Sequence, residues 1–157
     1  MRLIYPVPVE KWIVRQSGDG QLLSRRKSPR KGRLEHVFLE LIRIPRLITE
    51  QNFSIQVVMV REEEIQADDG RGSWRRLGRS ILDRRLIEVI ETVTFNTPTD
   101  FGRLLPADLP ETFSASDLRA AIGGPLTLAR KMVYCLSRMG VIDPAGKRGR
   151  AYLYRKA

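Results

Sequence analysis

Only one cysteine and one histidine occur among the 157 residues, which restricts the chemistry open to this chain. Cys135 has no partner for an internal disulfide, so we expect a protein of the reducing cytoplasm and a buried thiol. His36 has no cysteine or second histidine beside it, so we expect a surface or packed histidine and no metal site. A Ser-His-Asp set is excluded because no Gly-x-Ser-x-Gly turn accompanies the histidine.

Long apolar runs and nucleotide-binding loops are also missing. No segment reaches the apolar length of a membrane span. Arg2 is followed by few apolar residues before Pro6 and Pro8 interrupt, so we expect no secretory signal. Gly123 and Gly124 precede a helix pattern but lack the lysine and the spacing of a phosphate-binding loop. We therefore expect no cofactor, no catalytic residue and no resident metal.

Positive charge, in contrast, is in excess, with 28 Lys and Arg against 18 Asp and Glu and a net charge of +10. Residues 1–32 hold eight basic and two acidic residues, and residues 116–157 hold nine and two. Residues 33–115 hold 11 basic and 14 acidic residues. This pattern favours an anionic partner. Nucleic acid is favoured over a membrane, because no lipid-anchor motif or long amphipathic basic helix is present.

Residues 112–157 carry the clearest pattern, which predicts a helix, a tight turn, a second helix and a two-stranded ribbon. Ser114 or Ser116 suits the cap of the first helix, which Gly123 would end, and Pro125 suits the first turn of the second helix. The apolar positions of the second helix should face the core: Leu128 or Ala129, Met132, Val133, Leu136 and Met139. Its outward face would present residues that can donate to phosphates or base edges: Thr127, Arg130, Lys131, Tyr134 and Arg138.

The ribbon would follow as residues 141–142 and 151–154, with a basic, glycine-containing turn between them. Lys147, Arg148 and Arg150 lie at its tip. This arrangement resembles a winged helix-turn-helix domain, in which the second helix reads double-stranded DNA and the hairpin touches the backbone or the minor groove. Two alternatives stay open, since such a domain can serve only as a protein-interaction scaffold and a basic hairpin can simply protect a strand edge from pairing.

The N-terminal part reads as extended segments, because Pro6 and Pro8 exclude a helix there. The turn signal at residues 17–20 predicts a hairpin that returns along residues 21–24. Residues 24–33 follow, and their composition predicts a loop or arm. Such an arm is either a solvated linker or a second grip on DNA phosphates. The grip would use five basic residues: Arg25, Arg26, Lys27, Arg30 and Lys31.

In the middle of the chain, apolar spacing predicts a helix over residues 34–48 that ends or kinks at Pro45. Residues 53–60 form a nearly continuous apolar run and predict a central strand. Residues 74–79 are expected to be the return strand of a hairpin.

Residues 80–90 fit a helix or a strand, and we favour a helix followed by a short strand at residues 92–95. Thr97 and Pro98 form a helix start, which gives a helix over residues 98–105. Helices between residues 80 and 105 could complete a three-helix core.

Five acids cluster after the central strand, namely Glu62, Glu63, Glu64, Asp68 and Asp69. Clustered carboxylates at a strand end are typical of Mg²⁺-dependent nucleases, where they hold the metal. The Glu-x-Lys that restriction-type nucleases carry on the neighbouring strand is absent. The alternative is a solvated strand end whose acids offset nearby arginines.

Most of the chain is similar to a group of uncharacterised bacterial proteins, through the segments VREEEI, DGRGSWRR and KMVYCLSRMG and the GKRGRAYLY terminus. That resemblance brings no activity with it. We therefore expect an α+β protein with an α/β region at residues 1–95 and a winged helix-turn-helix domain at residues 96–157. The leading hypothesis is a non-enzymatic, cytoplasmic DNA-binding protein of the transcription-regulator kind. The alternatives are a metal-dependent nuclease and a protein-binding adaptor.

Overall fold

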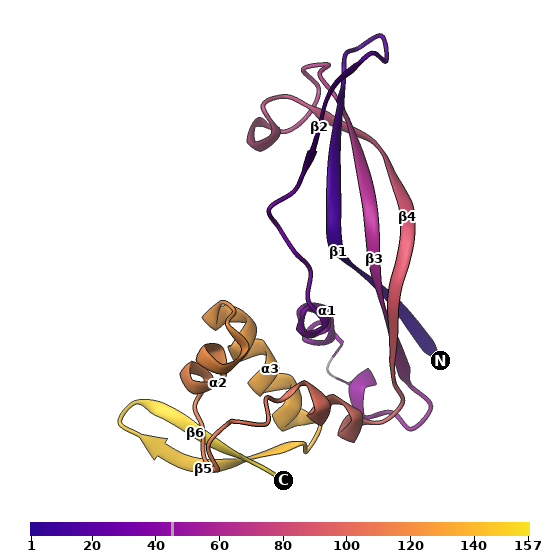
Figure 1. Ribbon diagram of the computed structural model, residues 1–157. Helices are drawn as coiled ribbons and strands as arrows, with labels where there is room; N and C mark the ends of the chain where they lie inside the picture. The colour runs from indigo at the N-terminus through magenta and orange to yellow at the C-terminus, as the bar shows by residue number, and fades with distance from the viewer. Residues whose placement is uncertain (45) are drawn as a thin grey trace. The chain divides into compact units, whose positions relative to one another are not determined.

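The computed structural model describes residues 1–44 and 46–157 as a mixed α+β protein, which confirms the α+β part of the expected fold class (Figure 1). The chain divides into two compact units, each discontinuous in sequence. We call them the sheet unit, residues 6–33 and 58–92, and the helical unit, residues 1–5, 34–57 and 93–157. No helix in the described ranges is long and apolar enough to cross a membrane.

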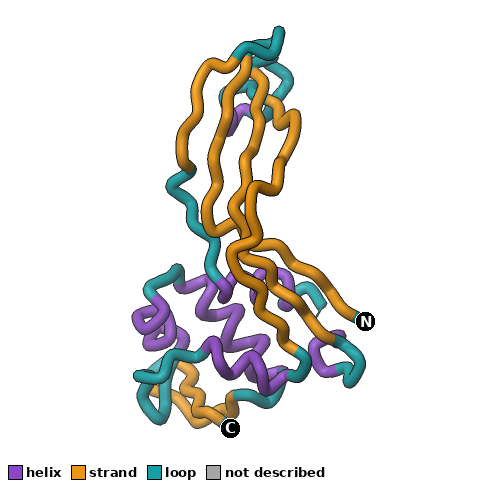
Figure 2. The backbone as a smooth tube through the Cα atoms, turned by 45° about the vertical axis from the view of Figure 1, so that its right-hand side comes forward, coloured by secondary structure: helices purple, strands orange, loops and turns teal. Residues whose placement is uncertain are grey.

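Four strands form one sheet in the order β2-β1-β3-β4, and they appear in orange in Figure 2. Their bounds are β1 Arg2–Gln16, β2 Leu22–Lys27, β3 Ser54–Ala67 and β4 Ser80–Phe95. The expected N-terminal hairpin is confirmed, because β1 pairs antiparallel with β2 and Trp12 lies opposite Lys27. The basic loop expected from residue 24 was partly wrong. Residues 24–27 belong to β2, because pairing with β1 gives their backbone groups partners.

The expected central strand is confirmed, since β3 has neighbours on both sides. Three large apolar residues of β3 in the sheet unit are buried, namely Met59, Val60 and Ile65, and so are Val7 and Val14 of β1. The strand is longer than expected and includes the three consecutive glutamates. The clustered acids therefore do not all follow the end of the strand, as the sequence interpretation assumed.

The helix favoured over residues 80–90 was wrong, because these residues belong to β4. The sequence fits either structure, and pairing with β3 decided in favour of the strand. The return strand expected at residues 74–79 was also wrong. Residues Trp74–Arg76 form a 3₁₀ turn, and Leu77 and Gly78 follow with φ of 54° and 77°, so the chain reverses before β4 begins.

The helical unit begins with short helices where one helix was expected over residues 34–48. A 3₁₀ turn at Leu34–His36 leads into α1, Val37–Leu41, and a second 3₁₀ turn follows at Leu47–Thr49. Pro45, which was expected to break this helix, lies outside the described residues.

Helix α1 packs against α3, and so does the 3₁₀ helix Pro98–Leu104, which lies within the range 80–105 expected to complete this core, whereas residues 80–90 form no helix. Phe38 of α1 lies with its ring centroid 6.0 Å from that of Phe101, which in turn stacks on Phe95 at 4.4 Å. Phe101 belongs to the 3₁₀ helix Pro98–Leu104, so the expected helix start at Thr97 and Pro98 is confirmed. Aromatic packing thus joins segments that are far apart in the sequence.

The C-terminal elements follow the expected order: α2 Ala115–Ile122, α3 Leu126–Arg138, β5 Ile142–Arg148 and β6 Ala151–Lys156. Ser114 caps α2, Gly123 ends it with φ of 65°, and every predicted core position of α3 is buried. Strands β5 and β6 form an antiparallel hairpin, here called the C-terminal hairpin. Its strands reach Arg148 and Ala151, so the turn is shorter than expected. A bridge between Phe113 and Tyr154 links β6 to the segment before α2.

Candidate nucleic-acid interface

The outward face of α3 carries the first part of the site. Four of the five predicted residues are exposed and Lys131 is half-buried. Arg130, Tyr134 and Arg138 are spaced four residues apart, so they form one stripe along the helix. The guanidinium of Arg138 lies 5.4 Å from the Tyr134 ring centroid, a cation–π distance that orients both side chains. The stripe therefore presents planar donors and an aromatic ring together.

The C-terminal hairpin carries the second part, and its cations have different surroundings. Lys147 lies over the ring of Tyr152 at 4.6 Å from the centroid. Arg150 is exposed in the turn. Arg148 donates to Asp117 of α2 at 2.9 Å. The hairpin is thus tied to α2 through Arg148, while Lys147 and Arg150 remain exposed.

The partner of Arg148 also builds the start of α2. Asp117 accepts from the backbone N–H of Ser114 at 2.8 Å, and the Ser114 hydroxyl accepts from the Asp117 N–H at 3.2 Å. The backbone and hydroxyl of Ser114, together with Arg148, hold the pKa of Asp117 below its usual range. This reciprocal cap explains why α2 begins where it does.

A cleft of about 520 Å³ lies between these elements. Arg130, Tyr134 and Arg138 line it from α3, and Arg150 lines it from the hairpin turn. The other predicted residues of the two elements, Thr127, Lys131, Lys147 and Arg148, are not among its lining residues. Within the described ranges, no Asp or Glu lines the cleft. The charged residues of the described lining are therefore all basic.

The sequence interpretation missed several lining residues that carry hydroxyl groups: Ser114, Ser116, Ser137, Tyr152 and Tyr154. A signal for three of them was present. Tyr152 and Tyr154 are two residues apart in a strand, so their side chains share one face of β6, and Ser137 is seven residues after Arg130 on α3, which places it on the same helix face. Ser114 and Ser116 gave no such signal, because their approach to the cleft depends on how α2 packs on α3.

The second predicted group of basic residues lies in the sheet unit, where acids compensate part of it. Arg25 pairs with Glu63 at 3.2 Å, and its guanidinium lies 4.1 Å from the Trp12 ring centroid. Lys27 pairs with Glu10 at 3.0 Å. The remaining three, Arg26, Arg30 and Lys31, have exposed side chains.

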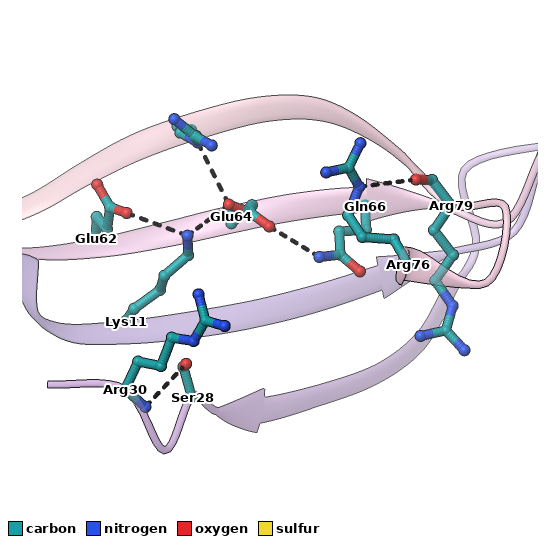
Figure 3. Close-up of polar contacts among 9 residues, drawn as sticks. Lys11, Ser28, Arg30, Glu62, Glu64, Gln66, Arg76 and Arg79 are labelled. Carbon is teal, nitrogen blue, oxygen red and sulfur yellow. Dashed lines mark hydrogen bonds and ion pairs between the residues drawn. The ribbon is translucent and has the colours of Figure 1, made fainter. Parts of the chain in front are cut away.

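The acidic cluster forms an ion-pair network, part of which Figure 3 shows. Glu64 is 4% exposed and lies 2.5 Å from Lys11 and 3.3 Å from Arg84. It also accepts from Gln66 at 2.8 Å. Burial raises the pKa of Glu64, but the bonds from Lys11 and Gln66 and the charge of Arg84 outweigh it, so its pKa is lowered.

The other acids also have partners within the sheet unit. Glu62 lies 3.6 Å from Lys11, Asp68 lies 2.6 Å from Arg15, and Asp69 accepts from the Ser80 hydroxyl at 2.6 Å. Across residues 1–44 and 46–157, no group of three or more His, Cys, Asp or Glu could hold a metal ion. The arrangement of these acids is that of an ion-pair network along the sheet.

The single cysteine and the single histidine lie in the helical unit. Cys135 is buried in α3, as expected. Burial raises the pKa of its thiol to about 11, against the opposing effect of Lys131, so the thiol is protonated at neutral pH. His36 is half-buried at the end of a 3₁₀ turn. Both placements agree with packing roles.

Comparison with known proteins adds a family but no activity. A family model described as "Domain of unknown function (DUF8091)" matches residues 1–96. An uncharacterised protein of Treponema pallidum (strain Nichols) is 33% identical over 154 residues, which cover 98% of this chain and 61% of the relative. The chain thus spans less than two thirds of that relative's length. No solved structure matches. The helices and hairpin that form the cleft lie beyond the residues matched by the family model.

Proposed function

The chain belongs to the family described as Domain of unknown function (DUF8091), and we propose that this member binds double-stranded DNA through its C-terminal elements. In this proposal, residues 96–157 act as a winged helix-turn-helix domain: α2 and α3 are the helix pair and the C-terminal hairpin is the wing. The protein would act as a transcription regulator or an accessory DNA-binding protein and not as an enzyme.

The observation that carries the proposal is the cleft between α3 and the hairpin. It brings Arg130, Arg138 and Arg150 together with no acidic side chain among its described lining residues. Arginine is the side chain best suited to planar, two-bond recognition of phosphates and of guanine edges. An uncompensated set of arginines therefore favours an anionic partner with planar groups over a neutral one.

Double-stranded DNA is favoured over other anions by the shape of the supporting elements. An α-helix fits the major groove, and the exposed stripe of α3 would face the base edges. The hairpin residues Lys147 and Arg150 would contact the backbone beside the groove. The hydroxyl group of Ser116, which is exposed at the cleft, would add a donor to phosphate.

Residues 24–33 support a weaker, second contact. Arg25 and Lys27 already have acidic partners. Only Arg26, Arg30 and Lys31 would add attraction for phosphates in the manner of a flexible arm. Their contribution should be the smaller one, because two of the five cations predicted in this segment already have acidic partners.

The test is binding of a fluorescent DNA duplex by a charge-reversal variant, Arg130→Glu with Arg150→Glu. We expect affinity to fall by about tenfold or more, because each arginine contact with DNA is worth about 1 kcal/mol or more. The matched control is Arg119→Glu with Arg155→Glu, which changes the net charge equally at exposed residues of the same unit outside the cleft.

Equal losses in the two variants would show that only net charge matters and would contradict the proposed interface. Failure of the unaltered protein to bind duplex DNA at low salt would remove the DNA proposal altogether. The same samples run on a gel with Mg²⁺ test the nuclease alternative, which predicts cut DNA that disappears when Glu62, Glu63 and Glu64 are replaced by alanine. The adaptor alternative predicts that reversing the charges of Arg130 and Arg150 leaves the function of the protein intact.

A further inference from the structure

Strand β4 is an outer strand of the sheet, with β3 as its only neighbour in the described sheet order. It runs for 16 residues without proline or glycine. Between residues 82 and 92 every side chain is exposed. A long outer strand leaves a row of backbone N–H and C=O groups without strand partners, and such a row is a template for another strand.

The exposed side chains of β4 are largely apolar. Leu86 is 62% exposed, and four further large apolar residues are each close to half exposed or more: Leu82, Ile87, Val89 and Ile90. Single exposed apolar residues are ordinary, but five of them on one outer strand are not. Leu82, Leu86 and Ile90 share one face of β4, and Ile87 and Val89 share the other, because side chains alternate along a strand. All five belong to the sheet unit.

The strand at the opposite edge of the same sheet, β2, is much shorter than β4. Strand β2 has six residues and ends with the consecutive cations Arg25, Arg26 and Lys27. The buried Ser28 and then Pro29 follow, so the edge stops there. Short length, like charges and a nearby proline are the means by which proteins prevent edge pairing. The two edges therefore differ in how far they allow another strand to add.

We propose that β4 pairs antiparallel with β4 of a second copy of this chain, about a two-fold axis at Leu86. In an antiparallel pair, two residues directly opposite each other both point their backbone N–H and C=O groups toward the partner strand or both point them away. These directions alternate along β4, so in a two-fold pair of identical strands opposite residues are separated by an even number of positions. The two-fold axis must therefore pass through a residue and not between two residues. A centre at Leu86 places Leu86 opposite its own copy, Leu82 opposite Ile90 and Arg84 opposite Glu88.

Charge complementarity selects this register among its neighbours. A centre at Ile87 places Asp83 opposite Glu91, and a centre at Glu88 places two glutamates opposite each other. A centre at Arg85 places two arginines opposite each other. Like charges directly opposite destabilise a strand pair, whereas Arg84 opposite Glu88 occurs twice in the Leu86 register and stabilises it.

Contacts already present within one chain fit this pairing. Arg84 lies 3.3 Å from Glu64, and Glu88 pairs with Arg61. The new Arg84–Glu88 pairs would join these into one network across the axis.

A disulfide test reports directly on the axis. Leu86→Cys should form an intermolecular disulfide under mild oxidation, because the Cα atoms of directly opposite residues lie about 4.5–5.5 Å apart in an antiparallel pair, within the Cα range of disulfides. The native Cys135 is buried and should not react. The matched control is Leu22→Cys, at an exposed leucine on the opposite edge strand. Linkage that is equally fast in both variants, or absent in both, would overturn the proposal.

Sedimentation tests the same surface without a cysteine. We expect the unaltered chain to be dimeric and Leu86→Lys to raise the dimer dissociation constant by about tenfold or more, since two ammonium groups would meet at the axis. Leu22→Lys should leave dimerisation unchanged. A monomer at every concentration, or a dimer that Leu86→Lys does not weaken, would overturn the proposal. Neither measurement involves DNA, so its outcome is independent of the proposed function.

Discussion

The two basic regions of this chain look alike in sequence but differ in how their cations are used. In the sheet unit, Arg25 pairs with Glu63 and Lys27 pairs with Glu10. In the cleft of the helical unit, three arginines lie together and none of the described lining residues is acidic. Net charge locates basic segments, but the ion pairs decide which positive charge is available to a partner. The cleft is therefore the stronger candidate for DNA.

The largest expected effect comes from breaking the charge compensation in the sheet unit. Glu64→Gln should lower the free energy of unfolding by about 2 kcal/mol, because Lys11 and Arg84 lose a buried partner while Lys11 keeps Glu62. Urea unfolding measures this change, with Glu91→Gln at an exposed acid as the control. A loss no greater than in the control would mean that these acids are not structural.

Replacing one arginine from each basic region by alanine tests which region binds DNA. Arg138→Ala should weaken binding to duplex DNA by about 1–2 kcal/mol, because it removes a cleft arginine and the support that it gives to Tyr134. Arg25→Ala should change binding by less than about 0.5 kcal/mol, since Arg25 is already paired with Glu63. Fluorescence polarisation compares the two variants directly. The reverse order of effects would place the interface in the sheet unit.

A smaller effect is expected at the cap of α2, which borders the cleft. Ser114→Ala should cost about 1 kcal/mol of stability, because the N–H of Asp117 loses its acceptor. Ser116→Ala is the matched control, since Ser116 also lines the cleft but does not cap the helix. Thermal unfolding distinguishes the two. Equal stability of both variants would contradict the capping role.

The smallest expected effect concerns the pH dependence of stability and the pair that Arg148 of the hairpin forms with Asp117. The pKa of Asp117 is lowered in the folded chain by Ser114 and Arg148, whereas in the unfolded chain it should lie at about 3.9. The carboxylate therefore stabilises the fold above the unfolded pKa, and this stabilisation is lost as the pH falls through the folded pKa. Unfolding measured between neutral and acidic pH should show a smaller acid-induced loss for Asp117→Asn. An identical pH profile would contradict the assignment.

The C-terminal elements could be predicted because their signals are local. A serine cap, a glycine stop and apolar spacing of 3–4 residues define α2 and α3 within one short stretch. Strand β4 could not be predicted, because the segment SILDRRLIEVI fits the apolar spacing of a helix and that of a strand. The choice depends on pairing with β3, which comes earlier in the sequence. The contribution of α1 to the core around α3 was missed for the same reason. The packing of Phe38 against Phe101 joins residues that no local pattern relates.

The candidate site shows the same division. Arg130, Tyr134 and Arg138 could be assigned to one helix face from spacing alone. Their approach to Arg150 and Tyr152 depends on how the hairpin packs, which sequence spacing does not encode. The partners of the acidic cluster were likewise hidden, because Lys11 and Arg84 come from different strands than Glu64. Predicting ion pairs between strands requires knowing which strands are neighbours, and the order of the strands depends on the fold of the whole chain.

The salt dependence of duplex binding tests the central claim most directly. Each phosphate that the protein neutralises releases counterions, so log K should fall steeply and linearly with log salt. We expect the slope to decrease in magnitude by about one for Arg150→Ala, because Arg150 is the cleft residue proposed to contact the DNA backbone, and to stay unchanged for Arg119→Ala. A flat salt dependence, or a slope that Arg150→Ala leaves unaltered, would contradict DNA binding at this cleft.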